Sequence, residues 1–226
     1  MSEGKAAATV VPASSVDTAL ATRIAALLGR AFTDEARVAD YTESERLRWA
    51  DDIRRVRAAD AGHAILMPRD WLERFPSVRN LDLAADRRMP AWHLVRDGEG
   101  YLAGHVAIFE RSFKLGQHRR FQAGFIEDVA TEPSDAGQGL ATLLMREAAG
   151  VGASRGYPLL ALSTRIPGFY ERLGWGRWTG DVTLIGREDT RTIDRAMTLA
   201  LTAGGTRMLT SARGKSFSVR EPGTPP

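Results

Sequence analysis

Residues 121 to 156 restrict the fold more than any other part of the chain. The apolar run Phe121 to Thr131 predicts a strand, and a stripe at helical spacing predicts a helix soon after it: Leu140, Leu143, Leu144 and Val151. Between the two lies Gly137-Gln138-Gly139. The order strand, glycine turn, helix exposes unpaired backbone N–H groups at the positive end of a helix dipole. Such a place binds anions, usually phosphate.

Two common nucleotide-binding folds do not fit this turn. No Gly-Lys-Ser or Gly-Lys-Thr follows the turn directly, which excludes a P-loop at this place. No third glycine stands at the Rossmann spacing. Two strand-like runs, Ala91 to Arg96 and Tyr101 to Arg111, precede the turn. They are joined by Asp97-Gly98-Glu99-Gly100, which favours an antiparallel hairpin. A dinucleotide-binding fold would not supply this antiparallel meander.

Patterns elsewhere in the chain predict further elements. Before the hairpin we expect a strand and three helices, the third a short one that follows Pro68 and ends near Pro76. After the glycine turn we expect a strand, a helix and two more strands. Ser211 to Pro226 is rich in Ser, Gly, Pro and charge, so we expect a frayed tail there. In chain order the expected elements are Thr9-Val10-Val11, Asp17 to Phe32, a helix opened by Thr42-x-x-Glu45, the short helix after Pro68, Leu159 to Leu162, Pro167 to Gly174, Thr179 to Ile185 and Ala196 to Ala203.

Composition narrows the class of protein. The chain has 226 residues, 43% of them apolar, which suits one domain over residues 1–210, a helical insertion at about 34–89 and a flexible tail at 211–226. The absence of cysteine excludes disulfides and a thiol nucleophile. No segment resembles a signal peptide or a spanning helix, so we expect a soluble, cytoplasmic protein without a membrane partner.

Charge and histidine spacing argue against other functions. The net charge is only +3, and the excess of arginine reflects either codon bias or a basic rim that attracts an anionic cofactor; a nucleic-acid partner is not expected. The four histidines have no metal-ligand spacing, and no serine lies in a Gly-x-Ser-x-Gly elbow. We therefore expect no metal and no serine-hydrolase chemistry.

Three motifs in series resemble the core of the GNAT acyltransferases. They are Gly124-Phe-Ile-Glu-Asp-Val-Ala-Thr131, Gly137-Gln-Gly-Leu-Ala141 and Phe169-Tyr-Glu-Arg-Leu-Gly-Trp175. The resemblance implies a mixed α/β (α+β) fold whose central, mostly antiparallel sheet splays between its fourth and fifth strands, with flanking helices. It also implies acetyl-CoA (coenzyme A) as the acyl donor. Ala136 departs from the family pattern, which has Gln or Arg at that position.

The resemblance assigns roles to individual residues. Glu127 would act as a base, commonly through water, and Tyr170 would protonate the coenzyme A thiolate. The other reading of Glu127 is a carboxylate paired with an arginine, and that of Tyr170 is a core side chain. The cofactor would be bound by the backbone of Val129, whose N–H is assigned to the oxyanion, and by Thr131, Gly137, Gln138, Gly139, Leu140 and Ala141.

The acceptor is less constrained. Within the superfamily the C-terminal half is similar to the aminoglycoside 2'-N-acetyltransferases, through Gly124-aromatic-x-Glu127-x-Val129-Ala130, Leu162-Ser163 and Tyr170-x-x-x-Gly174-Trp175-x-x-Trp178-x-Gly180. We expect a small-molecule amine, an aminosugar or an aminoglycoside antibiotic. Candidate acceptor contacts are Asp34, Glu35, Ser163, Thr164 and Trp178, whereas Trp175 is assigned to the core. Ser163 and Thr164 would otherwise cap the helix at Pro167, and the acidic pair would otherwise be solvated.

Two other functions stay open at this stage. The hairpin 91–111 followed by Lys114-Leu115-Gly116 also resembles the nodulation-factor N-acyltransferases, which acylate an amino-sugar oligomer. Because Ala136 departs from the loop pattern, a non-catalytic acyl-CoA-binding module is the second alternative. Retention of both Glu127 and Tyr170 argues against that module. A homodimer is compatible with the sequence.

Overall fold

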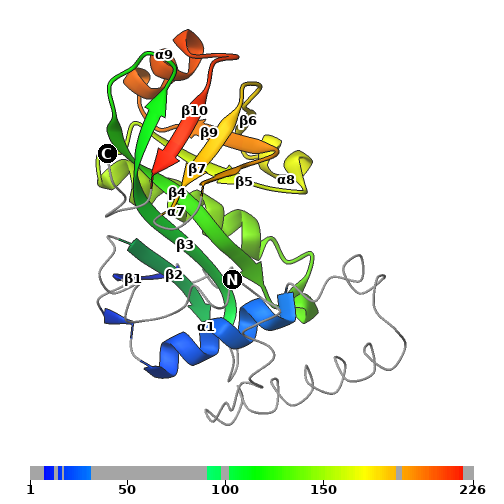
Figure 1. Ribbon diagram of the computed structural model, residues 1–226. Helices are drawn as coiled ribbons and strands as arrows, with labels where there is room; N and C mark the ends of the chain where they lie inside the picture. Colours follow the sequence, from blue (N-terminus) through cyan, green and yellow to red (C-terminus); the bar gives the residue numbers. More distant parts are fainter. Residues whose placement is uncertain are drawn as a thin grey trace. The chain divides into compact units, whose positions relative to one another are not determined.

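The computed structural model describes residues 8–12, 15–16, 18–31, 91–97, 102–186 and 190–220 (Figure 1). The helical insertion expected at 34–89 lies outside these residues. The described elements are β1 (Thr9–Pro12), α1 (Thr18–Ala31), β2 (Ala91–Asp97), β3 (Leu102–Leu115), β4 (Phe121–Thr131), η2 (Pro133–Asp135), α7 (Leu140–Ser154), β5 (Leu159–Ser163), α8 (Pro167–Glu171), β6 (Gly176–Arg177), β7 (Val182–Ile185), β8 (Thr190–Thr192), β9 (Ala196–Ala200), α9 (Ala203–Ser211) and β10 (Phe217–Arg220).

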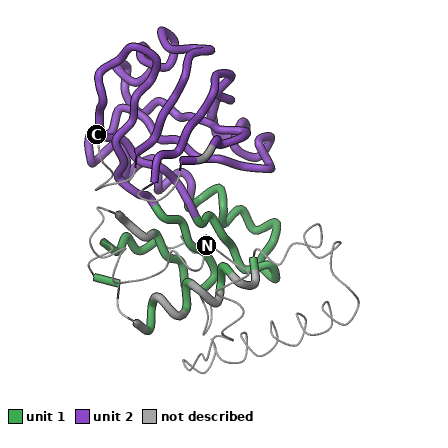
Figure 2. Tube along the Cα trace, in the orientation of Figure 1, with its two compact units in different colours: residues 1–107, 128–144 green, residues 108–127, 145–226 purple. Residues whose placement is uncertain are grey.

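The chain divides into two compact units (Figure 2). Unit 1 comprises residues 1–107 and 128–144, and unit 2 comprises residues 108–127 and 145–226. Strands β3 and β4 and helix α7 each contribute residues to both units. In unit 1, β1 pairs with β2 in antiparallel register, Thr9 opposite Val95, and β2 pairs with β3. Apolar residues of α1 at helical spacing are fully buried: Ile24, Leu27 and Leu28.

The strands of unit 2 follow the order β6-β9-β5-β4-β3-β10-β7-β8. The sheet is mixed, because β4 and β5 are parallel whereas β9 is antiparallel to β5. Gly124 of β4 faces Leu160 of β5, and a Cβ on this glycine would lie 2.5 Å from a Leu160 methyl carbon. Pairing between β4 and β5 is confined to Gly124–Leu160 and Phe125–Ala161, although β5 continues to Ser163. The two strands therefore separate after Phe125, and the predicted splayed, mixed sheet is confirmed.

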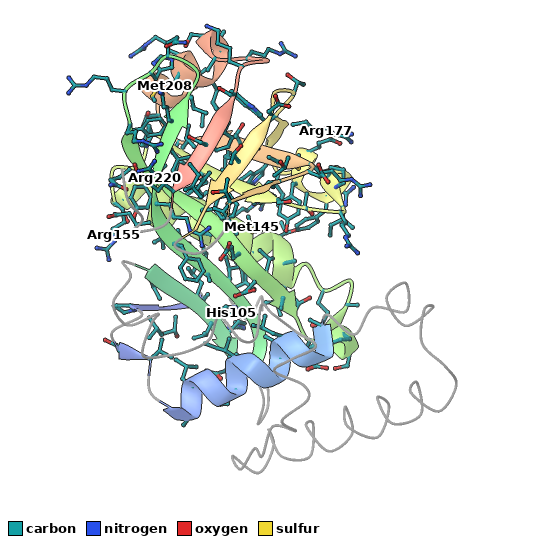
Figure 3. All side chains as sticks on the ribbon, viewed as in Figure 1. His105, Met145, Arg155, Arg177, Met208 and Arg220 are labelled. Carbon is teal, nitrogen blue, oxygen red and sulfur yellow. The ribbon has the colours of Figure 1, made fainter. Side chains whose placement is uncertain are left out.

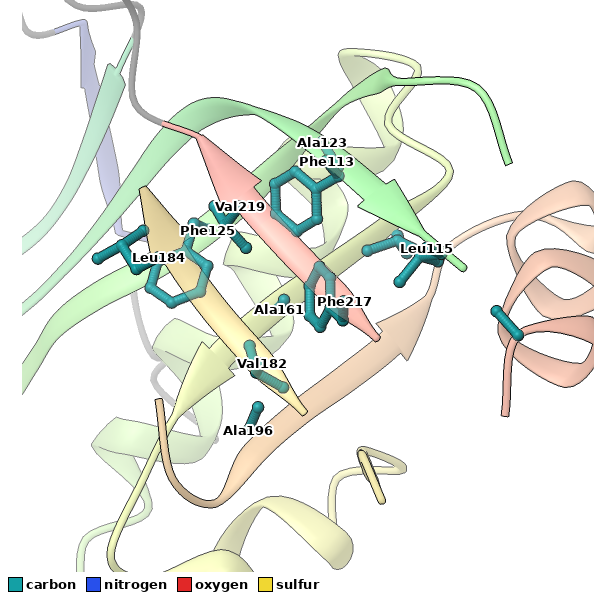
Figure 4. Packing of buried hydrophobic residues seen from close by; sticks show 12 residues of the cluster. Phe113, Leu115, Ala123, Phe125, Ala161, Val182, Leu184, Ala196, Phe217 and Val219 are labelled. Carbon is teal, nitrogen blue, oxygen red and sulfur yellow. The ribbon is translucent and has the colours of Figure 1, made fainter. Parts of the chain in front are cut away.

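The expected frayed tail is wrong for Phe217–Arg220. These residues form β10, which is antiparallel to β3 and parallel to β7. Phe217 and Val219 are buried, and the Phe217 ring centroid lies 5.4 Å from that of Phe113 (Figure 4). Polar neighbours hide this strand in the sequence, because only two of its four side chains face the core. Helix α9, which precedes it, was also not predicted.

Candidate active site

The backbone of β4 leaves the extended conformation at Asp128, whose φ is 52°. Residues other than glycine rarely enter this left-handed region, so surrounding contacts must hold it. One such contact comes from the buried His105 of β3 (Figure 3), whose Nδ1 lies 2.9 Å from the Asp128 carbonyl oxygen. Since a carbonyl oxygen only accepts, Nδ1 is the donor. The alternation of side chains between the two faces of a strand is interrupted at Asp128.

The peptide that joins Asp128 to Val129 has a defined direction. It is trans, so its C=O and N–H point in opposite directions. Its carbonyl points to His105, and the Val129 N–H therefore points away from His105. Strand β4 ends two residues later, at Thr131. The sequence resemblance assigns this N–H to the oxyanion.

The glycine turn before α7 belongs to unit 1. Gly137 and Gly139 have φ values of 82° and 76°, and a Cβ on either would meet no atom within 4 Å. Glycine is therefore required here by backbone conformation and not by lack of space. Gly139 accepts the first helical bond, from the N–H of Leu143. The N–H groups of Leu140, Ala141 and the following residue come too early in the helix to have an intrahelical acceptor.

Positive charge in residues 128–144 comes from the backbone, because the ionisable side chains of this segment are acidic. Residues 128–144 include no Lys or Arg, and Ala136 supplies no polar side chain where the family pattern has Gln or Arg. Ala136 and Gln138 are exposed. An anion bound here would interact with oriented N–H groups and the helix dipole. The expected cofactor residues Gly137 to Ala141 thus lie in one continuous, open turn that fits a phosphate.

Glu127 forms an ion pair with an arginine, which was the alternative interpretation of this residue from the sequence. Its two carboxylate oxygens accept from Arg111 of β3, at 3.1 and 3.2 Å. The Arg111 side chain is 3% exposed and that of Glu127 is 23% exposed. Bidentate arginine–carboxylate pairs are strong and directional. The carboxylate is therefore anchored from β3, while part of its surface stays accessible.

Glu127 and the segment that leads to Tyr170 leave the same end of a parallel strand pair. Phe125 is opposite Ala161, so Glu127 and Ser163 each lie two residues further along strands that run in the same direction. Ser163 ends β5, and α8 follows with Tyr170. Both candidate catalytic residues thus come from the end of unit 2 at which β4 and β5 separate.

Tyr170 is a buried phenol. It is 6% exposed, and its ring makes edge contacts with Phe169 and Trp175, at centroid distances of 4.9 and 6.0 Å. Burial raises the pKa of Tyr170 to about 12, and a side-chain hydrogen bond with Thr164 opposes part of that rise. The hydroxyl is consequently protonated at neutral pH and able to donate.

The other expected acceptor residues make local contacts. Ser163 Oγ donates to the Asp194 carbonyl oxygen at 2.8 Å. Thr164 Oγ1 accepts from the Ile166 N–H at 3.1 Å, which is a local turn contact before α8 and not a cap of the helix. Trp178 Nε1 donates to the Lys215 carbonyl oxygen at 3.1 Å, and its ring packs on Phe217. These contacts give Trp178 a structural role in unit 2.

The remaining predictions concern Trp175 and the acidic pair Asp34 and Glu35. Trp175 is 3% exposed, so its assignment to the core is confirmed. Asp34 and Glu35 lie outside the described residues. Sequence reasoning missed Arg111 and His105, although each is a cationic or titratable residue inside an apolar strand run, and that pattern could have marked them.

None of the helices in the described ranges is long and apolar enough to cross a membrane. Within those ranges we find no group of three or more acidic, His or Cys side chains suited to a metal ion.

Comparisons with known proteins identify the family of this chain. The profile of the acetyltransferase (GNAT) domain family matches residues 14–178, a range that includes Glu127, the glycine turn and Tyr170. The chain belongs to the GNAT acetyltransferase family. The expected enzyme class, an acetyl-CoA-dependent N-acetyltransferase, is thereby confirmed at the level of the family. A comparison with curated protein sequences gives no significant match.

A solved structure supports the same fold. The chain is similar to a GNAT family N-acetyltransferase (YhbS) from Escherichia coli in complex with CoA, with a TM-score of 0.54 and 18% identity over 98% of this chain and 93% of that one. It is also similar to a GNAT family acetyltransferase from Brucella melitensis in complex with acetyl-CoA. There the TM-score is 0.46 and the identity 16%, over 86% of this chain and 88% of the other.

Proposed function

We propose that this chain transfers the acetyl group of acetyl-CoA to a primary amine of an aminosugar, with the 2'-amine of an aminoglycoside antibiotic as the leading acceptor. Family membership supports the reaction type. The observation that carries the mechanism is Tyr170, a buried and protonated phenol at the position of the family's thiolate acid. The acceptor rests on the sequence pattern around Glu127, Ser163 and Trp178.

Acetyl-CoA supplies the acetyl group as a thioester. The backbone N–H groups of Gly137 to Ala141 bind its pyrophosphate, since this turn is open and precedes the N-terminus of a fifteen-residue helix. Without a basic side chain in residues 128–144, affinity depends on these N–H groups. The Val129 N–H donates to the thioester carbonyl oxygen and stabilises the negative charge that develops there.

Tyr170 holds a proton at Oη for the departing thiolate. With a pKa of about 12 it remains protonated over the whole physiological range. A free thiol has a pKa of about 8.5, so transfer of this proton to the thiolate runs against the pKa difference. The Tyr170 hydroxyl hydrogen-bonds the sulfur as its negative charge develops, and the proton that the ammonium releases through water restores the phenol. Thr164 orients the phenol through its hydrogen bond.

Glu127 acts as an ionised carboxylate and not as a lone base. Each carboxylate oxygen accepts from Arg111 and retains further acceptor capacity. A water molecule or the amine N–H of the acceptor binds there, and the proton of the alkyl ammonium, with a pKa near 10, leaves through water. This relay agrees with a carboxylate that is anchored on one side and accessible on the other.

A thiol-release assay tests this function. The purified chain is incubated with acetyl-CoA and each of a panel of aminoglycosides, other aminosugars, polyamines and amino acids, and the product is identified by mass. We expect release of free coenzyme A with aminosugars that carry a 2'-amine, and no release with their 2'-hydroxyl counterparts. Release with other amines alone would reject the aminosugar acceptor. Absence of release with every amine, together with retained acetyl-CoA binding, would support the non-catalytic module instead.

A further inference from the structure

Arg111 of β3 binds the residue of β4 that precedes the left-handed Asp128. It binds both carboxylate oxygens of Glu127, at 3.1 and 3.2 Å, and both residues belong to unit 2. Glu127 immediately precedes Asp128, at which β4 turns into the left-handed region. The ion pair therefore acts at the point where strand geometry no longer fixes side-chain direction.

Two aromatic rings hold the guanidinium independently of the carboxylate. Its central carbon lies 5.4 Å from the centroid of Phe109 and 5.0 Å from that of Phe125. Residues two apart on a strand share a face, so Phe109 accompanies Arg111 on β3 and Phe125 accompanies Glu127 on β4. Arginine stacks on aromatic faces and presents a rigid, planar fork. The two rings therefore orient the guanidinium independently of its contact with Glu127.

The ion pair fixes the orientation of the Glu127 carboxylate more than it adds electrostatic attraction for a substrate. One positive and one negative charge in bidentate contact nearly cancel at a distance, so the pair attracts a cationic acceptor weakly. The carboxylate has about four acceptor positions, and Arg111 occupies one on each oxygen. The remaining positions belong to a side chain that is 23% exposed.

We propose that Arg111 is a positioning residue for acetyl transfer, which aims the free acceptor positions of Glu127 at the incoming amine or its water. This inference rests on the proposed function, because it acts through Glu127. Misplacement of a catalytic group by about 1 Å can cost roughly 100-fold in rate. We therefore expect kcat to fall on loss of Arg111, with the KM for acetyl-CoA nearly unchanged.

A double-mutant cycle tests this role. The variants are Arg111→Met, Glu127→Gln and the double substitution, measured by coenzyme A release with the best acceptor and by thermal unfolding. We expect Arg111→Met to lower kcat by roughly 100-fold in the wild-type background and to have almost no further effect with Glu127→Gln. An equal loss of kcat in both backgrounds would show that Arg111 supports the fold alone, and would overturn the inference while the proposed function stands.

Arg111→Lys is the alternative test variant if Arg111→Met does not fold. Lysine keeps the charge but cannot form the bidentate contact, so we expect a kcat between those of wild type and Arg111→Met. Full activity of Arg111→Lys would overturn the geometric role. Arg23→Met removes an arginine from another arginine–carboxylate pair, that with Asp97, and should leave kcat unchanged. If the wild-type chain acetylates no amine, the proposed function fails and this inference fails with it.

Discussion

Tyr170 and Tyr157 are two buried phenols of unit 2 with different surroundings. Tyr157 donates to Glu110 at 2.7 Å, and burial, followed by this hydrogen bond, raises its pKa. The pKa of Tyr170 is raised to about 12 chiefly by burial, and the hydrogen-bond partner of its hydroxyl is the neutral Thr164. A proton on Tyr157 is thus held by a carboxylate, whereas the proton on Tyr170 is restrained mainly by the cost of burying a phenolate. Only the second arrangement suits a donor.

The pKa of Tyr170 predicts an alkaline loss of stability. A group with a raised pKa in the folded state contributes fully below its unfolded pKa, about 10, and its contribution is lost as pH rises through about 12. The two-unit difference corresponds to about 3 kcal/mol of unfolding free energy. We expect Tyr170→Phe to lose less stability than wild type between these pH values, in denaturant unfolding at fixed ionic strength. Parallel curves for the two proteins would show that burial of Tyr170 does not oppose its ionisation.

Strand β4, the glycine turn and α7 form the element that the sequence predicted best. Strand bounds at Phe121 and Thr131 and a helix that begins after Gly139 agree with the structure. Strong local signals explain this, because apolar periodicity and paired glycines act within a few residues. The left-handed Asp128 could not be predicted, since its contact with His105 joins residues that are 23 positions apart. The Glu127–Arg111 pair likewise depends on strand pairing.

Two glycines near α7 predict opposite effects. Gly139→Ala forces a side chain into a φ of 76°, which costs about 1–2 kcal/mol and disturbs the N–H groups of the turn. We expect weaker acetyl-CoA binding by calorimetry and lower stability. Gly150 lies within α7, and a Cβ there would meet no atom within 4 Å. Gly150→Ala should therefore add about 0.5–1 kcal/mol of stability through better helix propensity, with binding unchanged. Equal binding by both variants would remove the turn from the cofactor site.

At the scale of the whole molecule, the family pattern fixes the reaction and leaves the acceptor to parts of the chain with weaker signals. The mixed sheet and its separation between β4 and β5 were predictable once three motifs in series were recognised. Strand β10 was not, because its place between β3 and β7 depends on partners about 100 and 35 residues earlier in the chain. Asp34 and Glu35, two of the five expected acceptor residues, remain predictions.

The central claim is that Tyr170 donates the proton to the departing thiolate, and Tyr170→Phe tests it most directly. Tyr157→Phe is the matched control, since it removes another buried phenolic hydroxyl from unit 2. Steady-state coenzyme A release with the best acceptor gives kcat, and calorimetry gives the acetyl-CoA affinity of each folded variant. The account predicts a kcat lowered by roughly 100-fold or more in Tyr170→Phe alone, with acetyl-CoA affinity retained in both variants. An unchanged kcat in Tyr170→Phe would contradict it.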